Sequence, residues 1–228
     1  MDALLAFAAA LVSLRLCADL ARRFRTQRAP QLAAWCAALG TYAVAAGALA
    51  WGAADGWSAP AFRVYYLAGG LLTAPLLGAG SLLLIGRRWV GAVALAYVGL
   101  AAGVAIAAPL HGGLSGTDVP SAQDVLSFWP ARLLAVTANS VGTLVVVAVA
   151  LATFRRRPLG NALILAGVGV AAIGSGLAGL GVGALAPAVA GAALLLYAGF
   201  VTPTASSVSL NRLVRPARQE PSAPRTRG

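Results

Sequence analysis

The chain has 228 residues, of which 60% are hydrophobic and only 10% are charged, and its mean hydropathy is +0.83. This composition is too apolar for an ordinary soluble domain and places the chain among integral membrane proteins. The formal net charge of +11 comes from 17 basic residues, all arginines, most of which cluster at the ends of apolar segments. Because they do not form a basic face or groove, nucleic acid is not an expected partner.

Apolar segments long enough to cross a membrane follow one another along the chain. A helix needs about 20 residues, at about 1.5 Å each, to cross a hydrocarbon core of about 30 Å. Five segments meet this requirement, each bounded by charges or by a Pro/Gly turn: 3–21, 32–54, 61–85, 89–108 and 131–154. A last apolar run, 162–202, has 41 residues, about twice one crossing.

The middle of the 162–202 run, from Gly179 to Pro187, has the glycines and the proline that are typical of a tight turn. We therefore predict a helical hairpin there, which makes the fold an all-α, polytopic membrane bundle of seven transmembrane helices. Small residues recur every four positions from Gly167 to Gly183 and predict a close helix contact, either within the bundle or at a homodimer face. The alternative for the run is one crossing or a re-entrant segment.

The arginine clusters test this count independently of hydropathy. They lie at residues 22–28, 87–88, 155–157 and 212–227, after the first, third, fifth and last predicted helices. Cytoplasmic loops carry an excess of arginine, and seven crossings put all four clusters on one side of the membrane. The sequence therefore predicts an amino terminus outside and a carboxyl terminus in the cytoplasm.

The chain divides into a seven-helix transmembrane domain, residues 1–203, and a basic cytoplasmic tail, residues 204–228, which is expected to be disordered because it is rich in Pro, Ser and Arg. The first segment lacks a basic region before it, which favours a retained anchor over a cleaved signal peptide. Arginine in place of all lysine is typical of a high-GC bacterium, so we expect a multi-pass protein of a bacterial plasma membrane. Its inner arginines are expected to contact anionic lipid heads.

Polar residues inside the third and fifth predicted helices form part of a candidate cavity or polar cluster. Pro75 removes a backbone donor from the third helix and should kink it close to Thr73. Asn139 is the deepest strongly polar side chain of the fifth helix, and an interhelical hydrogen bond would offset its burial. These positions either line a cavity or serve ordinary helix packing.

The outer ends of the same two helices complete this candidate cluster with Arg63, Tyr66 and Arg132. Arg63 and Arg132 depart from the rule that arginines lie on the inner side. They either pair with Asp118 or Asp124 around the mouth of a cavity, or extend toward lipid head groups.

The first helix contains a candidate ion pair. Arg15 and Asp19 lie four residues apart, at the spacing that lets side chains on one helix face meet. The pair either orients the helix or belongs to a functional site. Cys17 and Cys36 fall at similar depth in neighbouring helices, where contact is feasible, although buried cysteines most often behave as small apolar residues.

The residues usually needed by a membrane enzyme are missing. Glu220, in the tail, is the only glutamate, so no pair of carboxylates is available in the bundle for general acid and base catalysis. His111 is the only histidine and has no nearby cysteine to complete a metal site. We therefore predict no catalytic residue, no metal site and no cofactor.

The run of residues 73–77, Thr-Ala-Pro-Leu-Leu, resembles the threonine–proline–leucine patch in the third helix of microbial rhodopsins. A retinal pigment is excluded, because the chain has no lysine to bind retinal and no carboxylate between Arg63 and Pro75. Pro30-Gln31 is similar to the motif of small sugar and vitamin carriers built from two three-helix bundles, but no second Pro-Gln occurs.

The chain is more similar to uncharacterised seven-helix integral membrane proteins of high-GC bacteria. The similarity lies in Phe-Arg-Val-Tyr-Tyr-Leu at 62–67, in Asn-Ser-Val-Gly-Thr at 139–143, and in a polar turn with Asn161. It implies a seven-helix fold and no particular activity.

These observations favour a non-enzymatic accessory or interaction protein whose partner is a second copy or another protein. The alternative is a transporter or binder of a small, largely apolar molecule in a cavity between the third and fifth helices. A third hypothesis is a membrane-embedded lipid-modifying enzyme that uses Asp19 or Asn139. Fully paired polar groups would favour the first, and a cavity that meets Arg63, Thr73 and Asn139 would favour the second.

Overall fold

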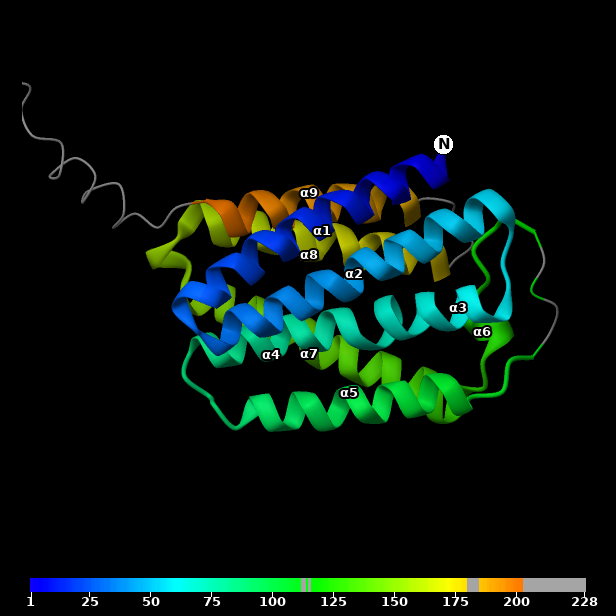
Figure 1. The fold of residues 1–228 in the computed structure, drawn as a ribbon, viewed down its shortest axis with the longest axis horizontal. Coiled ribbons are helices and arrows are strands. Elements are labelled where there is room, and N and C mark those ends of the chain that lie inside the picture. The colour runs from blue at the N-terminus through cyan, green and yellow to red at the C-terminus, as the bar shows by residue number, and fades with distance from the viewer. Residues whose placement is uncertain (112–113, 115, 180–184, 203–228) are drawn as a thin grey trace, which may run out of the picture.

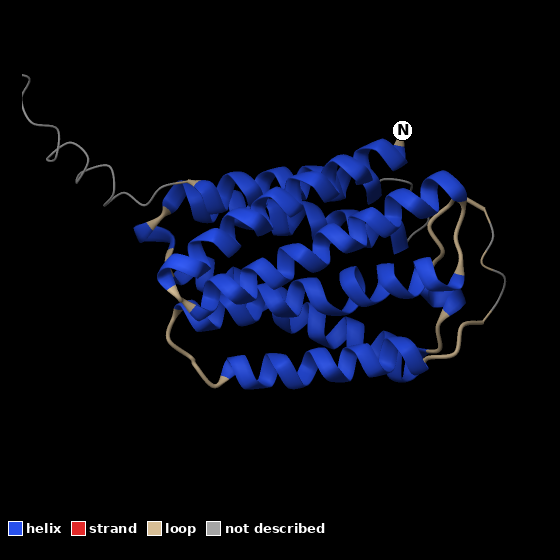
Figure 2. Cartoon of the chain, viewed as in Figure 1, coloured by secondary structure: helices blue, strands red, loops and turns tan. Residues whose placement is uncertain are grey.

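The structure is a computed structural model that describes residues 1–111, 114, 116–179 and 185–202. Within these residues the regular elements are helices, as the composition predicts (Figure 2). The expected disorder of the 204–228 tail and the centre of the turn expected after Gly179 concern residues outside this described part.

Six helical segments are long and apolar enough to cross a membrane, and one shorter apolar helix accompanies them. The first three are α1 (Asp2–Gln27), α2 (Pro30–Asp55) and the segment Ala59–Leu84, made of α3 (Ala59–Tyr65), the π-helical η1 (Tyr66–Leu72) and α4 (Thr73–Leu84). Then follow α5 (Val90–Ala107), the segment Phe128–Ala152 made of η2 (Phe128–Arg132) and α7 (Leu133–Ala152), α8 (Pro158–Gly179) and the shorter α9 (Leu185–Val201). Two short connecting helices are α6 (Ala122–Val125) and η3 (Phe154–Arg156).

The 162–202 run contains two antiparallel helices, α8 and α9. Gly160 near the start of α8 lies against Gly199 near the end of α9, since a Cβ atom on Gly160 would be 3.1 Å from the Gly199 oxygen. Farther along α8, a Cβ atom on Gly167 would be 3.1 Å from the Leu196 side chain of α9, and one on Gly174 would overlap with Ala188 of α9. Glycines seven residues apart thus form this contact, because two antiparallel helices that wind around each other meet about every two turns.

The helices lie roughly parallel (Figure 1), and their contacts form a ring that is closed unevenly. Contacts are extensive between α1 and α2, α2 and α4, α4 and α7, α8 and α9, and α9 and α1, whereas α7 and α8 touch much less. The α5 helix lies at the edge, against α4 and η1. The α1–α2, α4–α5 and α7–α8 connections lie at one end of the bundle, on the left in Figure 1. They carry three of the arginine clusters, so we call this end the arginine end.

Large apolar side chains cover the outside of the bundle. Leu4, Phe7, Leu11 and Leu14 form a stripe along α1, and each is more than half exposed. Soluble monomers rarely expose so continuous an apolar surface, whereas lipid tails can cover it. Together with helix length and hydropathy, this surface identifies a multi-pass membrane protein.

Two helix backbones come into direct contact where α4 crosses α7. A Cβ atom on Gly142 of α7 would be 2.5 Å from the Ala74 oxygen and 2.8 Å from the Pro75 nitrogen. A Cβ atom on Gly78 would be 2.9 Å from the Gly142 oxygen. Two helix backbones therefore touch directly, which only small residues permit.

We expect Gly142→Ala to lower the free energy of unfolding by about 1–3 kcal/mol, because the added methyl group must push the two backbones apart. The matched control is Gly99→Ala in α5, where a Cβ atom meets nothing within 4 Å. The control should be neutral or slightly stabilising, since alanine favours helices more than glycine does. Equilibrium unfolding in mixed micelles measures both, and equal effects would contradict the close crossing.

Candidate functional site

Side-chain donors surround the junction between the π-helical η1 and α4. Pro75 has no N–H group and crowds the carbonyl four residues earlier, so the Leu71 oxygen loses its usual helical partner. The Tyr97 hydroxyl of α5 donates to that oxygen at 2.7 Å. The Asn139 amide of α7 donates to the Gly70 oxygen at 2.6 Å, and the Thr73 hydroxyl donates to the Ala68 oxygen at 2.8 Å. Tyr97 and Asn139 thus supply donors from neighbouring helices, whereas the Thr73 hydroxyl adds a second donor to a carbonyl that already accepts the Thr73 backbone N–H.

The outer candidates also bond to the backbone. Arg63 donates from Nη1 to the carbonyl oxygens of Ala105 and Ile106, at 2.8 Å for the latter, and so caps the end of α5. The Tyr66 hydroxyl donates to the Ala131 oxygen at 3.1 Å. The fifth candidate, Arg132, lies over the Phe128 ring, 5.6 Å from its centre. Among the described residues, neither arginine forms an ion pair with Asp118 or Asp124.

The structure therefore brings Thr73 and Asn139 together around η1 and places Arg63 and Arg132 apart from them. Each of these polar groups has a partner within the bundle. None of the five candidates lines the cavity described next.

A cavity of about 730 Å³ opens in the half of the bundle nearer the arginine end. The α4 and α7 segments, which are the third and fifth predicted helices, form one wall, and α8 and α9 form the other. Trp35 of α2 also contributes, with its ring 5.1 Å from that of Phe200. The lining residues are Trp35, Leu77, Ser81, Leu84, Ile85, Gly86, Val146, Val149, Ala150, Thr153, Arg156, Arg157, Asn161, Ile164, Val168, Leu196 and Phe200.

The polar lining of this cavity gathers at the start of α8. Asn161 is buried and donates through Nδ2 to the Ala150 oxygen at 3.1 Å and the Thr153 hydroxyl at 2.9 Å. It therefore links α8 to the end of α7 instead of only capping its own helix. Exposed Arg156 lines the same region. The cavity thus combines an apolar wall with a basic, hydrogen-bonding mouth.

Arg157 joins the mouth of the cavity to the end of α9. Its Nη2 atom donates to the Gly199 oxygen at 3.1 Å and to the Thr202 oxygen at 2.6 Å. Its Nε atom is buried and has no hydrogen-bond partner among the described residues. Burial, followed by repulsion from Arg23, lowers the pKa of Arg157 from its ordinary value. An anion at this mouth would relieve both the unpaired donor and the repulsion.

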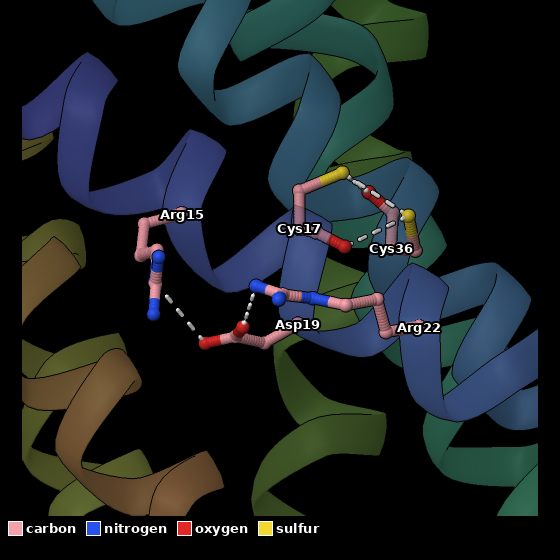
Figure 3. Close-up of polar contacts among 5 residues, drawn as sticks. All are labelled: Arg15, Cys17, Asp19, Arg22 and Cys36. Atoms are coloured by element: carbon pink, nitrogen blue, oxygen red, sulfur yellow. Dashed lines mark hydrogen bonds and ion pairs between the residues drawn. The ribbon is translucent and has the colours of Figure 1, made fainter.

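A second polar group lies on α1 (Figure 3). Asp19 Oδ2 is 3.6 Å from Arg15 Nε, and its Oδ1 accepts a 2.7 Å hydrogen bond from Arg22. Both arginine side chains are about two-thirds exposed, so these contacts contribute little to stability. Cys17 and Cys36 are free thiols whose sulfur atoms lie 3.1 Å apart.

Sequence reasoning missed several cavity residues for identifiable reasons. Trp35 lies in an apolar segment whose sequence pattern does not indicate which face of the helix is buried. In the structure its ring packs so closely against Gly80 that a Cβ atom there would overlap with it. The 155–157 arginine cluster indicates membrane topology and lipid contact, which does not single out Arg156 and Arg157 as cavity residues. The polar Asn161 at a helix start was a usable signal, but capping explained it equally well.

No protein-family model matches the chain, and no curated protein or solved structure is significantly similar to it. The comparisons therefore identify no family, and the resemblance stated above rests on its short motifs alone. Helix length and hydropathy define the class: an apolar, multi-helix membrane protein of the polytopic type.

We expect Asn139→Leu to destabilise the protein by about 1–2 kcal/mol, because the Gly70 carbonyl loses its interhelical donor. The matched control on the same helix is Thr137→Val, since exposed Thr137 bonds only to carbonyls of its own helix. Unfolding in mixed micelles compares the two variants. A loss no larger for Asn139→Leu than for Thr137→Val would contradict the bracing of η1.

Proposed function

We propose that this protein is a non-enzymatic plasma-membrane protein that binds a small, largely apolar molecule with an anionic head group. The observation that carries this proposal is the cavity between α4, α7, α8 and α9, with its apolar wall and basic mouth. Its volume of about 730 Å³ falls within the range of about 300–1,000 Å³ typical of ligand sites.

The two parts of the cavity match the two parts of such a ligand. Leu77, Val146 and Leu196 offer an apolar surface to a hydrocarbon tail. Exposed Arg156 offers donors and positive charge to a carboxylate or phosphate, and the guanidinium of Arg157 adds positive charge beside it. A ligand with an anionic head and an apolar tail would bind the arginines at the mouth and cover the apolar wall of the cavity.

The weak contact between α7 and α8 supports entry from the lipid phase. These helices touch far less than α4 and α7 or α8 and α9 do, although they are consecutive in the chain. We therefore expect the ring to open most easily between α7 and α8, because the fewest contacts have to be broken there. An amphipathic ligand already dissolved in the bilayer needs no aqueous channel to reach the cavity.

The proposal includes seven crossings, with the amino terminus outside and the arginine end in the cytoplasm. Three arginine clusters gather at one end, as the excess of arginine in cytoplasmic loops requires. The described part of α9, 17 residues or about 26 Å, is slightly shorter than the hydrocarbon core. A small local thinning of the bilayer accommodates such a helix. Anionic lipid heads would then face the arginine loops.

A second candidate function is an accessory protein that binds another protein or a second copy. The observation that favours it is the closed outer half, where Arg63, Tyr66, Thr73 and Asn139 are all bonded to backbone carbonyls. In that case the cavity holds bulk lipid without selectivity. A lipid-modifying enzyme gains no support from the geometry, because Asp19 is engaged by two arginines and Asn139 by Gly70.

Quenching of Trp35 fluorescence distinguishes the two candidates. We expect 9,10-dibromostearate to quench the purified protein in nanodiscs saturably, and the saturable part to disappear in Trp35→Phe. The uncharged methyl ester of the same acid should bind more weakly. Quenching that rises without saturation, or that is equal for acid and ester, would favour the accessory function.

Two pairs of variants locate the binding site. Val149→Phe fills the cavity and should abolish saturable quenching, whereas Val141→Phe, on the exposed face of the same helix, should not. Arg156→Gln should weaken binding of the acid by roughly two- to five-fold, the effect of losing one solvent-exposed charge. Its control is Arg155→Gln, which is exposed and outside the lining. Equal effects within either pair would place the probe elsewhere.

Cysteine labelling in intact cells tests the orientation, with Cys17 and Cys36 replaced by alanine. We expect Thr117→Cys, an exposed position at the end opposite the arginines, to react with a membrane-impermeant maleimide. Exposed Arg88→Cys should react only after the cells are permeabilised. The reverse pattern would overturn the proposed orientation.

A further inference from the structure

The two cysteines of the chain meet across the α1–α2 contact (Figure 3). Their sulfur atoms lie 3.1 Å apart. Each thiol also lies against the other residue's backbone: Cys17 Sγ is 3.1 Å from the Cys36 oxygen, and Cys36 Sγ is 3.3 Å from the Cys17 oxygen. This reciprocal arrangement brings both side chains and both backbones together at one point.

The geometry favours a direct bond between the sulfur atoms over a shared metal ion. A disulfide bond is about 2.05 Å long, so the two atoms need to approach by only about 1 Å. Two thiolates bound to one zinc ion in tetrahedral geometry, with bonds of about 2.3 Å, would hold their sulfur atoms about 3.8 Å apart. Among the described residues, no group of three or more His, Cys, Asp or Glu side chains gathers to hold a metal ion.

We infer that Cys17 and Cys36 form an oxidisable dithiol that closes to a disulfide between α1 and α2. The two thiols lose two protons and two electrons as the S–S bond forms, and a lipid-soluble quinone takes up both to become a quinol. A quinone suits the site because the pair is half-buried between two apolar helices and an apolar oxidant reaches it from the bilayer. This inference does not depend on the proposed ligand.

Closure of the bond would act on the arginine end. The link would enclose residues 18–35, which contain the 22–28 arginine cluster and the turn between the two helices. Because α1 and α2 already share the most extensive contact in the bundle, the bond fixes an existing arrangement instead of creating a new one. A thiol reductant reverses the reaction by exchange.

The test uses the full chain in nanodiscs, treated with tetramethylbenzoquinone, whose fully substituted ring does not add to thiols. We expect the intact mass to fall by two hydrogen atoms and to recover with a phosphine reductant. Peptide mapping should join Cys17 to Cys36 within one chain. In parallel, diamide, a general thiol oxidant, shows whether the pair closes at all.

The matched control combines Cys17→Ser with Leu14→Cys, which keeps two thiols in the same helices but moves one to the exposed face of α1. We expect no link within this chain under the same treatment. Equal closure in the control would overturn the role of the observed contact. Unchanged mass of the native chain with both oxidants would overturn the dithiol, and closure with diamide alone would overturn the quinone as its oxidant.

Discussion

The backbone contact between α4 and α7 is the constraint on which the rest of the bundle depends. Pro75 lacks an N–H group and leaves the Leu71 carbonyl without its helical partner, and Gly142 lets α7 approach Ala74 and Pro75 without a side chain between them. In hydrocarbon an unpaired carbonyl costs several kcal/mol, so this segment requires donors from other helices. Tyr97 and Asn139 supply them and thereby attach α5 and α7 to the same point.

The two halves of the bundle differ in the use of their polar side chains. In the half opposite the arginine end, Arg63 and Tyr66 bond to the backbones of neighbouring helices. Nearer the arginine end, a cavity of about 730 Å³ lies between α4, α7, α8 and α9, and Asn161 holds the start of α8 to the end of α7 beside it. Arg157 connects these features, since it holds the end of α9 while its unpaired Nε lies buried beside the cavity mouth.

The candidate residues show where sequence reasoning about a membrane protein succeeds and where it stops. Asn139 was expected to need an interhelical partner, because its amide is costly in hydrocarbon, and it has one. That the partner would be the Gly70 carbonyl could not be inferred, since it depends on η1. Asn161 and Trp35 became cavity residues only through packing that brings α2, α7, α8 and α9 to one place.

The all-α class, the apolar segments and the grouping of arginines between them follow from the chain alone. Bilayer thickness sets the length of a crossing, and backbone hydrogen bonds must form within each helix, so both constraints can be recognised in the sequence. Which faces meet, where the cavity lies and that Cys17 touches Cys36 depend on how the helices pack. The physical reason is that lipid tails are as apolar as the bundle interior, so polarity along these helices does not distinguish a lipid-facing side chain from a buried one.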